Sequence, residues 1–370
     1  MTQLPDRVRL VLLYGGRSAE HEVSCISAAN VVRALDPGRY SVELVAIDQS
    51  GTWHRAEAAE VLLAGGPASV PAAFPLEGPV VGREMALRPD GAGVDPDVPT
   101  VVFPVLHGPN GEDGTVQGFL ELLDVAYVGS GVLGSALCMD KAAAKTVLDA
   151  HDIPQGRWLQ VDRAILHDEA RCVALLSRLG QTVFVKPANM GSSVGISRRT
   201  GVEDLLAGLQ LAFDFDDVVV AEEALTVREL ETAVLGPSEE LRVSVVGEVI
   251  PAADFYDFDD KYVDGAAKTV VPADLPHLVA EEARSLAVRA ARVLRVEGMA
   301  RVDLFLTDDH RLLVNEVNTI PGFTDISMYP KLWGASGLTY AELLDELVRL
   351  ALERHSRRAQ LQRSRTEGAQ

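Results

Sequence analysis

Residues 298–322 read GMARVDLFLTDDHRLLVNEVNTIPG, and this stretch decides how the C-terminal half of the chain folds. Apolar runs on both sides of the polar residues 308–311 predict a β-hairpin with its turn at those residues. The simplest register pairs Thr307 with Leu312. The stretch therefore predicts two neighbouring antiparallel strands of one sheet.

The predicted hairpin gathers polar side chains on one face. Its register places Asp303 directly opposite Glu316. Arg301 and Asn318 oppose each other on the same face, because side chains alternate with a period of two. Facing carboxylates repel each other unless a cation lies between them, and Asp, Glu and Asn oxygens suit Mg²⁺ bound together with substrate phosphates. The alternative is a solvated face with an incidental charge pair, but the apolar residues of the other face anchor the hairpin and favour the metal.

A second motif, KPANMGSSVG at residues 186–195, follows a predicted strand. A lysine at a strand end, followed by a loop of small residues, can hold phosphates with backbone N–H groups and one point charge. An ordinary turn is the alternative, and the Walker A pattern GxxxxGK[ST] does not occur in the chain. Lysine is rare here, with six Lys against 28 Arg, so Lys186 is a better candidate for a functional charge than an average lysine.

Composition limits the class of partner. The 370 residues carry 34 basic and 54 acidic side chains, a net charge of −20, which argues against nucleic acid because a phosphate backbone needs a basic surface. Three widely spaced cysteines suit a reducing cytoplasm. No apolar run reaches about 18 residues and no signal-peptide pattern is present, so we expect a soluble cytoplasmic protein without a membrane partner.

The rest of the chain alternates strand-like and helix-like segments. Strand, helix and strand follow one another over residues 7–48, which predicts a parallel β-α-β unit. One helix is expected over about 131–150, opened by GSGVLG at 129–134. These glycines match the dinucleotide-binding pattern, but no acid closes a second strand about 20 residues later, so we expect no nicotinamide cofactor. Strands dominate from 228 onward, and the order predicts a parallel α/β domain followed by α+β material.

Three segments fall outside this alternation. Residues 64–100, rich in Gly, Pro and Ala, are expected to form long loops or an insertion. Residues 255–272 are polar, aromatic and irregular, which is typical of a loop that closes over a site as a lid. The Arg-rich residues 354–370 have no apolar stripe and are expected to be disordered.

Six separated strings together resemble the D-alanine–D-alanine ligase family of the ATP-grasp superfamily. In chain order they are GGRSAEHEVS (15–24), HGPNGEDG (107–114), MDK (139–141), KPANMGSSVG (186–195), KYVDGAAK (261–268) and NEVNTIPGFT (315–324). The resemblance covers about residues 8 to 350. It implies an N-terminal α/β domain (1–128) and a two-lobed ATP-grasp fold with a central subdomain (129–221) and a C-terminal subdomain (222–353).

The resemblance also implies an activity. Two D-alanine molecules would be joined to D-alanyl-D-alanine through an acyl phosphate, with release of ADP and phosphate, for peptidoglycan precursor synthesis. ATP would be a substrate and two Mg²⁺ ions, or Mn²⁺ in their place, would assist. The family further implies a cytoplasmic homodimer.

Matching positions imply residue roles in nucleotide and metal binding. Lys141 and Lys186 would bind ATP phosphates, and Lys261 would reach the γ-phosphate from the lid. The ATP-binding set is Lys141, Lys186, Glu222, Glu223, Leu225, Glu229 and Lys261, with Glu223 as a substitute for Glu222. The implied metal ligands are Asp303, Glu316 and Asn318, with Glu316 bridging the two ions.

The remaining roles concern D-alanine. The implied catalytic set is Glu20, Ser192, Tyr262, Arg301 and Gly322, in which Glu20 would hold the first amino group and Arg301 and the Gly322 N–H would stabilise an oxyanion. The implied substrate-binding set is Glu20, His107, Arg301, Ser327 and Met328. His107 is one candidate for the base that deprotonates the second D-alanine.

Two other functions stay open on the sequence. A D-alanine–D-lactate ligase would share the fold and the ATP chemistry, although Tyr262 beside Lys261 favours the dipeptide product. The other is a non-catalytic protein that binds ATP or an amino acid. Such a protein would be expected to lose its metal ligands first, and this chain retains all three expected ones.

Overall fold

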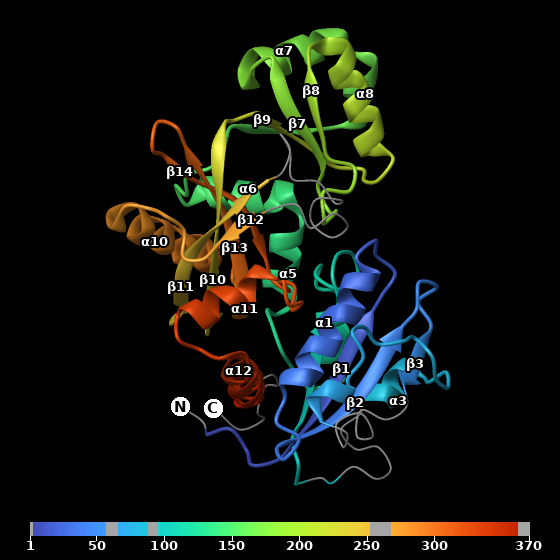
Figure 1. The fold of residues 1–370 in the computed structure, drawn as a ribbon. Coiled ribbons are helices and arrows are strands. Elements are labelled where there is room, and N and C mark those ends of the chain that lie inside the picture. The colour runs from blue at the N-terminus through green and yellow to red at the C-terminus, as the bar shows by residue number, and fades with distance from the viewer. Residues whose placement is uncertain (1–2, 57–65, 88–94, 96, 252–267, 362–370) are drawn as a thin grey trace, which may run out of the picture.

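The computed structural model describes residues 3–361 except 57–65, 88–94, 96 and 252–267. Within that part of the chain the strands form three sheets, which lie one below another through the molecule in Figure 1. The mixture of a largely parallel sheet with two antiparallel ones confirms the predicted fold class. None of the described helices is long and apolar enough to span a membrane.

The N-terminal sheet has the strand order β3-β2-β1-β4-β5. Its central strand β1 (Val8–Gly15) runs parallel to β2 (Tyr40–Ile47) and β4 (Thr100–Val105), and every residue of β1 is buried, as expected for a strand covered on both faces. The outer strands are β3 (Trp53–Ala56) and β5 (Ala126–Tyr127). The helical elements are α1 (His21–Ala34), the 3₁₀ turn η1 (Pro67–Ser69), α3 (Arg83–Leu87) and α4 (Thr115–Leu122), of which η1 and α3 are the helices described within the loop-rich 64–100 segment.

A pair of helices, rather than the single helix expected over 131–150, follows this sheet. Helix α5 (Val132–Met139) ends at Asp140, and α6 (Lys141–Ala150) begins directly after it. The Asp140 side chain accepts a hydrogen bond from the Ala143 N–H at 2.9 Å and so caps the second helix. The apolar periodicity runs through the break, which explains why the sequence pattern suggested one helix.

The central sheet has the order β6-β9-β7-β8, with antiparallel neighbours throughout. Its strands are β6 (Trp158–Val161), β7 (Thr182–Pro187), β8 (Ser197–Thr200) and β9 (Val219–Glu223). The 3₁₀ turn η2 (Arg163–His167), α7 (Glu169–Leu179) and α8 (Val202–Phe213) pack on it and enclose a separate apolar core. These elements form the green upper part of Figure 1.

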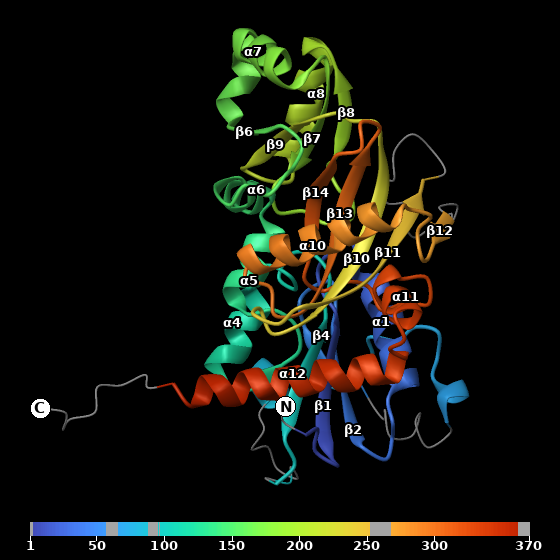
Figure 2. The ribbon, with the colours of Figure 1, turned by 90° about the vertical axis from the view of Figure 1, so that its left-hand side faces the viewer.

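The C-terminal sheet has the order β12-β11-β10-β13-β14. Its strands are β10 (Val227–Gly236), β11 (Arg242–Ile250), β12 (Lys268–Val270), β13 (Gly298–Thr307) and β14 (Leu312–Asn318). Helix α10 (His277–Val293) lies across one face of this sheet (Figure 2). Its alanines and Leu286 belong to the same apolar core as Val302 and Leu304. Arg301 and Asp303 alternate with these residues and therefore lie on the other face of β13.

The predicted hairpin forms, but its register differs near the turn. Leu306, and not Thr307, pairs with Leu312. A β-bulge in β14 then shifts the register by one residue, so that Asp303 still pairs with Glu316 and Arg301 with Asn318. The bulge lets Leu312, Val314 and Val317 all reach the core although their spacing is not strictly alternate.

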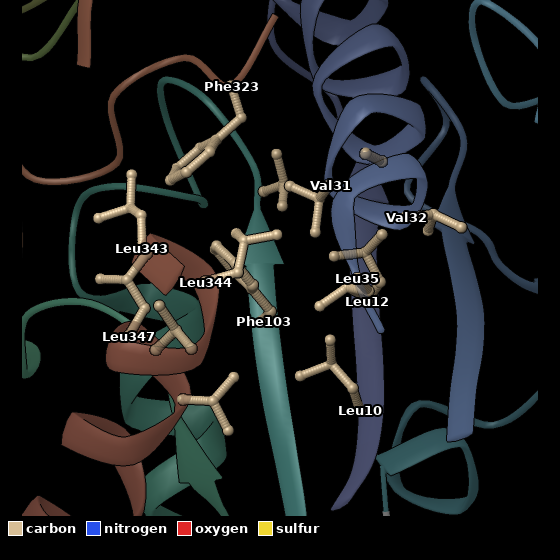
Figure 3. Packing of buried hydrophobic residues seen from close by; sticks show 14 of the residues in the cluster. Leu10, Leu12, Val31, Val32, Leu35, Phe103, Phe323, Leu343, Leu344 and Leu347 are labelled. Carbon is tan, nitrogen blue, oxygen red and sulfur yellow. The ribbon is translucent and has the colours of Figure 1, made fainter. Parts of the chain in front are cut away.

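Two further helices close the fold, α11 (Met328–Ala335) and α12 (Tyr340–Ala359). A capping box between Thr339 and Glu342 starts α12. Leu343, Leu344 and Leu347 of α12 pack against Phe103 of β4, so the last helix completes the core of the first sheet (Figure 3).

The expected disorder from residue 354 is therefore wrong over residues 354–359, which continue the helix. Arg354 is buried and donates hydrogen bonds to the carbonyl oxygens of Tyr127, at 2.7 Å, and Gly129. An arginine in place of an apolar residue hid the end of the apolar stripe. Residues 362–370 of the predicted tail lie outside the described part of the chain.

Candidate active site

The polar face of the C-terminal sheet carries a row of three carboxylates. Asp303 on β13 pairs in register with Glu231 on β10 and with Glu316 on β14. Directly paired residues point their side chains to the same face, so the three acids lie side by side across three strands. The sequence predicted the pairing of Asp303 with Glu316 but did not single out Glu231. The sequence did contain one indication of Glu231, because it follows the predicted residue Glu229 by two positions and so lies on the same face of the strand.

The guanidinium group of Arg301 lies among these carboxylates. Its Nε and Nη2 donate to the two carboxylate oxygens of Asp303, each at 2.7 Å. Its Nε also lies 3.2 Å from Oε2 of Glu231. Burial alone would lower the pKa of Arg301, but the charges of Asp303 and Glu231 hold that pKa well above its ordinary value. The described part of the row thus holds three acidic side chains around the guanidinium of Arg301.

The donor set of the row suits a divalent cation that arrives with a ligand. Among the described residues, no three His, Cys, Asp or Glu side chains converge closely enough to hold a metal by themselves. Asp303 and Glu316 supply two facing carboxylates. Asn318 adds an amide oxygen, which accepts a hydrogen bond from the Ile320 N–H at 3.1 Å. Oxygen donors of this number and kind bind Mg²⁺ when substrate phosphates complete the shell, so the residues fit the predicted metal.

A buried ion-pair cluster lies where α6 meets the central sheet. Oε2 of Glu222 accepts a hydrogen bond from Nζ of Lys186 at 3.0 Å, and its Oε1 lies 3.3 Å from Nζ of Lys145. Burial would raise the pKa of Glu222, but the two lysines lower it to about 2. Two lysines against one carboxylate leave a positive charge, which suits a phosphate.

Lys145 was not predicted as a site residue. Its side chain is only 4% exposed, and burial lowers the pKa of its ammonium group while Glu222 opposes that change. Lys145 comes four residues after Lys141 in α6, which places both lysines on one side of the helix, and this spacing was the available signal. Lys141 itself donates to the Met190 carbonyl at 2.6 Å, on the loop that follows β7.

The two neighbouring glutamates at the end of β9 have different partners. Glu223 accepts hydrogen bonds from the backbone N–H and from Nε of Arg157, both at 2.7 Å, on the outer side of β6. Glu222 points to the lysines. Leu225 is half-buried just beyond β9, and Glu229 lies on β10 two residues before Glu231.

The loop after β7 reaches the N-terminal sheet. Ser192 Oγ donates a short hydrogen bond to Oε1 of Glu20, which joins two of the predicted catalytic residues. A Cβ atom at Gly191 would lie 2.8 Å from Oε2 of Glu20, so a larger residue here would displace the Glu20 carboxylate. Ser192 itself has a φ of 45°, a left-handed conformation that costs energy in a non-glycine residue and is typical of functional loops. Tyr262 and Lys261, predicted to join this group, lie outside the described residues.

His107 lies buried after β4. Its Nδ1 is 3.0 Å from the Ile320 carbonyl oxygen and 3.7 Å from Oε1 of Glu112. Burial would lower the pKa of His107, but the carboxylates of Glu112 and Glu20 raise it above its ordinary value. No described residue hydrogen-bonds its Nε2. Glu112, five residues after His107 in the same polar string, was not predicted.

The segment between β14 and α11 holds the last predicted residues. An ideal Cβ at Gly322 would lie 2.6 Å from Oγ of Ser327, so this glycine leaves room for the hydroxyl. Ser327 Oγ accepts a hydrogen bond from the Thr324 N–H at 2.9 Å. The Met328 side chain is buried in the apolar core. A substrate contact at Met328 would therefore have to come from its backbone.

Comparison with known proteins identifies relatives over nearly the whole chain. Two family profiles match, "D-ala D-ala ligase N-terminus" over residues 9–130 and "D-ala D-ala ligase C-terminus" over residues 147–349. D-alanine–D-alanine ligase A of Escherichia coli K12 is 44% identical over 95% of this chain and 97% of the relative. The D-alanine–D-alanine ligase of Shouchella clausii is 43% identical over 96% and 98%.

Solved structures give the same result. The D-alanine–D-alanine ligase of Coxiella burnetii superposes with a TM-score of 0.79 at 36% identity, covering 96% of this chain and 97% of that one. The VanG D-Ala:D-Ser ligase of Enterococcus faecalis superposes with a TM-score of 0.78 at 33% identity, covering 93% and 99%. The same fold therefore occurs with a second substrate other than D-alanine.

Proposed function

This chain belongs to the D-alanine–D-alanine ligase family, and we propose that its site joins two D-alanine molecules at the expense of ATP. The products are D-alanyl-D-alanine, ADP and phosphate, and the dipeptide serves peptidoglycan precursor synthesis. The observation that carries the proposal is the positive cluster around Glu222 together with the carboxylate row on the C-terminal sheet. A phosphate-binding group and a cation-binding group are what phosphoryl transfer requires.

ATP binding is assigned to both groups. Lys141 and Lys186 bind the phosphates, while Glu222 and Leu225 receive the adenine and Glu229 the ribose. Glu222 suits an exocyclic amine because the carboxylate stays ionised and can accept its hydrogen bond. Lys261 remains a predicted phosphate ligand from outside the described residues.

Metal binding is assigned to Asp303, Glu316 and Asn318, which would hold two Mg²⁺ ions, or Mn²⁺ in their place. When bound, the ions would neutralise charge on the transferring phosphoryl group. The three residues supply oxygen donors from two adjoining strands, and carboxylate and amide oxygens are the ligands that Mg²⁺ prefers.

The chemistry then proceeds in two steps. The carboxylate of the first D-alanine, held through its amino group by Glu20, attacks the γ-phosphorus, and the bond from that phosphorus to the ADP oxygen breaks. The amine of the second D-alanine attacks the resulting acyl phosphate, and phosphate leaves. Arg301 and the Gly322 N–H stabilise the oxyanion that forms between these events. Nε2 of His107 is the atom we assign to receive the proton from the second ammonium group.

The identity of the second substrate is the finer question. The D-lactate alternative, and the D-serine ligase activity of the structural neighbour, differ from the proposal only in the nucleophile. We assign D-alanine because relatives that are 44% and 43% identical to this chain carry that activity in their names. We also propose that the protein acts as a homodimer in the cytoplasm, which light scattering and cell fractionation would test.

One assay tests the function. Purified protein with Mg²⁺ and ATP should release phosphate when D-alanine is added and should form D-alanyl-D-alanine, identified by mass. D-Lactate, D-serine and L-alanine should give much less phosphate and little mixed product. A protein that releases no phosphate in response to D-alanine would contradict the proposal, and a preference for D-lactate would move it to the other class. Glu316→Gln should abolish turnover while the circular dichroism spectrum stays unchanged.

A further inference from the structure

The carboxylate of Asp303 has two assigned partners, the guanidinium of Arg301 and a metal ion. In the structure both of its carboxylate oxygens accept hydrogen bonds from Arg301, each at 2.7 Å. The proposed function asks Asp303 to bind a metal ion with at least one of those oxygens. A metal ion and a guanidinium repel each other, so a metal ion at Asp303 weakens the attraction between Arg301 and the same carboxylate.

A second acidic residue, Glu231, also contacts Arg301. Oε2 of Glu231 lies 3.2 Å from Nε of Arg301, and Glu231 pairs in register with Asp303 from the neighbouring strand β10. Glu231 is 8% exposed, so a charge here without a partner would be costly. Its strand is on the opposite side of β13 from β14, which carries Glu316 and Asn318.

The row of acids is therefore asymmetric. The β14 side offers Glu316 and Asn318, which are oxygen donors for a metal. The β10 side offers Glu231, which contacts the guanidinium. Arg301 lies between them on β13 and can turn toward β10 without leaving its strand position. This arrangement would let the two positive charges lie on opposite sides of Asp303, with Glu316 and Asn318 as the residues that would hold the metal.

We propose that Glu231 is a positioning residue, which takes over Arg301 when Asp303 binds the metal and so keeps the guanidinium directed at the reacting carbonyl. This inference rests on the proposed function, because it needs both the metal and the oxyanion role of Arg301. It predicts that Glu231 favours metal binding through Arg301. Without Glu231, the arginine loses one of its two carboxylate contacts among the described residues and competes more strongly with the cation for Asp303.

Metal binding can be measured without turnover. Mn²⁺ would be titrated into the full-length protein with saturating ADP, and free Mn²⁺ would be followed by electron paramagnetic resonance. Glu231→Gln should weaken Mn²⁺ binding by about tenfold, the effect of one charge-assisted hydrogen bond. Glu248→Gln is the matched control, because Glu248 is also 8% exposed and pairs with an arginine, Arg228, at 2.7 Å in the same sheet. Its Mn²⁺ affinity should be unchanged.

A second background separates this effect from simple loss of negative charge. Arg301→Met frees Asp303 and should bind Mn²⁺ more tightly than wild type. If Glu231 acts through Arg301, adding Glu231→Gln to Arg301→Met should change the Mn²⁺ affinity by less than about twofold. Arg301→Lys serves in place of Arg301→Met if the latter does not fold, because one ammonium group cannot bridge two carboxylates in the same way.

The outcomes decide between the possibilities. Equal weakening of Mn²⁺ binding by Glu231→Gln in both backgrounds would mean that Glu231 acts by charge alone, and this would overturn the inference. An unchanged Mn²⁺ affinity in the single variant would overturn it as well. If wild type binds no Mn²⁺ with ADP and releases no phosphate with D-alanine, the proposed function itself fails, so the two failures are distinguishable.

Discussion

Lys145 contacts Glu222, a residue that we assign to nucleotide binding. It is one of two lysines that hold Glu222 ionised, and its side chain is almost fully buried. Lys145→Met should leave Glu222 with one partner and raise the KM for ATP by about tenfold, because a buried charge-assisted contact is lost. The value of kcat should change less, since Glu222 is assigned to the adenine and not to the transferred phosphoryl group.

Steady-state kinetics at saturating D-alanine would measure this change. Lys331→Met is the control, because Lys331 is a half-buried lysine of α11 with no assigned role. An unchanged KM for ATP in a folded Lys145→Met variant would show that Lys186 alone orients Glu222.

His107 predicts the pH dependence of the second step. Its Nδ1 contacts a carbonyl oxygen, which can only accept, so Nδ1 keeps its proton and Nε2 is the atom that titrates. The pKa of His107 is raised, so Nε2 is free to take a proton only above the ordinary value of about 6.5. The kcat/KM for the second D-alanine should therefore rise with pH through a limb centred above about 6.5.

The contribution of His107 to the free energy of unfolding changes with pH in the opposite direction to its contribution to kcat/KM. The contribution of protonated His107 to the free energy of unfolding is complete below about pH 6.5 and is lost as the pH rises through the folded-state pKa. His107→Gln should remove the limb in kcat/KM, and His355→Gln, a surface histidine of α12, should keep it. A wild-type limb at or below pH 6.5 would contradict this assignment.

Residue types near the site were largely predictable, because the strings that carry phosphate and metal chemistry are short and local. Lys186 and Asp303 were candidates on these grounds, Lys141 followed from the family resemblance, and the roles of all three stay predictions. Lys145, Glu231 and Glu112 were not singled out, because each is marked by the residue that it contacts. The partners of Lys145 and Glu231 lie on other secondary-structure elements, and the contact of Glu112 with His107 depends on how one loop folds, which a single sequence does not display.

At the scale of elements, the hairpin of β13 and β14 shows how the pairing of Asp303 with Glu316 could be predicted correctly from a register that was wrong at the turn. The expected pairing of Thr307 with Leu312 was wrong by one residue, and the bulge in β14 corrected the register before Asp303 was reached. The spacing of Leu312, Val314 and Val317 contained this bulge, since three core residues cannot lie on one face of a regular strand with that spacing. Bulges are set by burial, which short-range pairing rules ignore.

The contact between helix α12 and the first sheet leads to a prediction about stability. Arg354 satisfies the carbonyl oxygens of Tyr127 and Gly129 and stacks on the Tyr127 ring at 4.1 Å. Arg354→Met should lower the free energy of unfolding by about 3 kcal/mol, because two buried carbonyl groups lose their donors. Chemical denaturation would measure it.

Arg349→Met is the matched control. Arg349 pairs only with acids one turn away in its own helix, among the ion pairs recorded for the described residues, and its loss should cost less than about 1 kcal/mol. Equal losses in the two variants would show that the contact of α12 with the first sheet adds nothing to stability.

At the scale of the whole molecule, the assigned nucleotide contacts come from two sheets. Glu222 and Lys186 belong to the central sheet, and Glu316 belongs to the C-terminal sheet. ADP with Mg²⁺ should therefore stabilise both together, by about 2.7 kcal/mol at one hundred times its Kd. The unfolding midpoint in differential scanning fluorimetry should rise by several degrees in wild type and in Arg349→Met, but not in Glu222→Gln. A rise of equal size in all three proteins would contradict the assigned site.

A parallel α/β domain followed by α+β material could be predicted from strand and helix patterns, and the fold class agrees with the observed sheets. The packing of α12 on the first sheet could not. Nothing in residues 340–359 indicates which of the sheets their apolar stripe will cover, because every sheet offers an apolar face.

This return of the last helix to the first sheet affects the order of synthesis. On the ribosome, β1 and β4 emerge early, but Leu343, Leu344 and Leu347, which cover Phe103, emerge only near the end of translation. The nascent N-terminal region therefore keeps part of its core uncovered until the final helix leaves the exit tunnel. A premature stop before residue 340 would release a chain with that apolar surface exposed, and such a fragment should be bound by chaperones or degraded rather than accumulate as a stable domain.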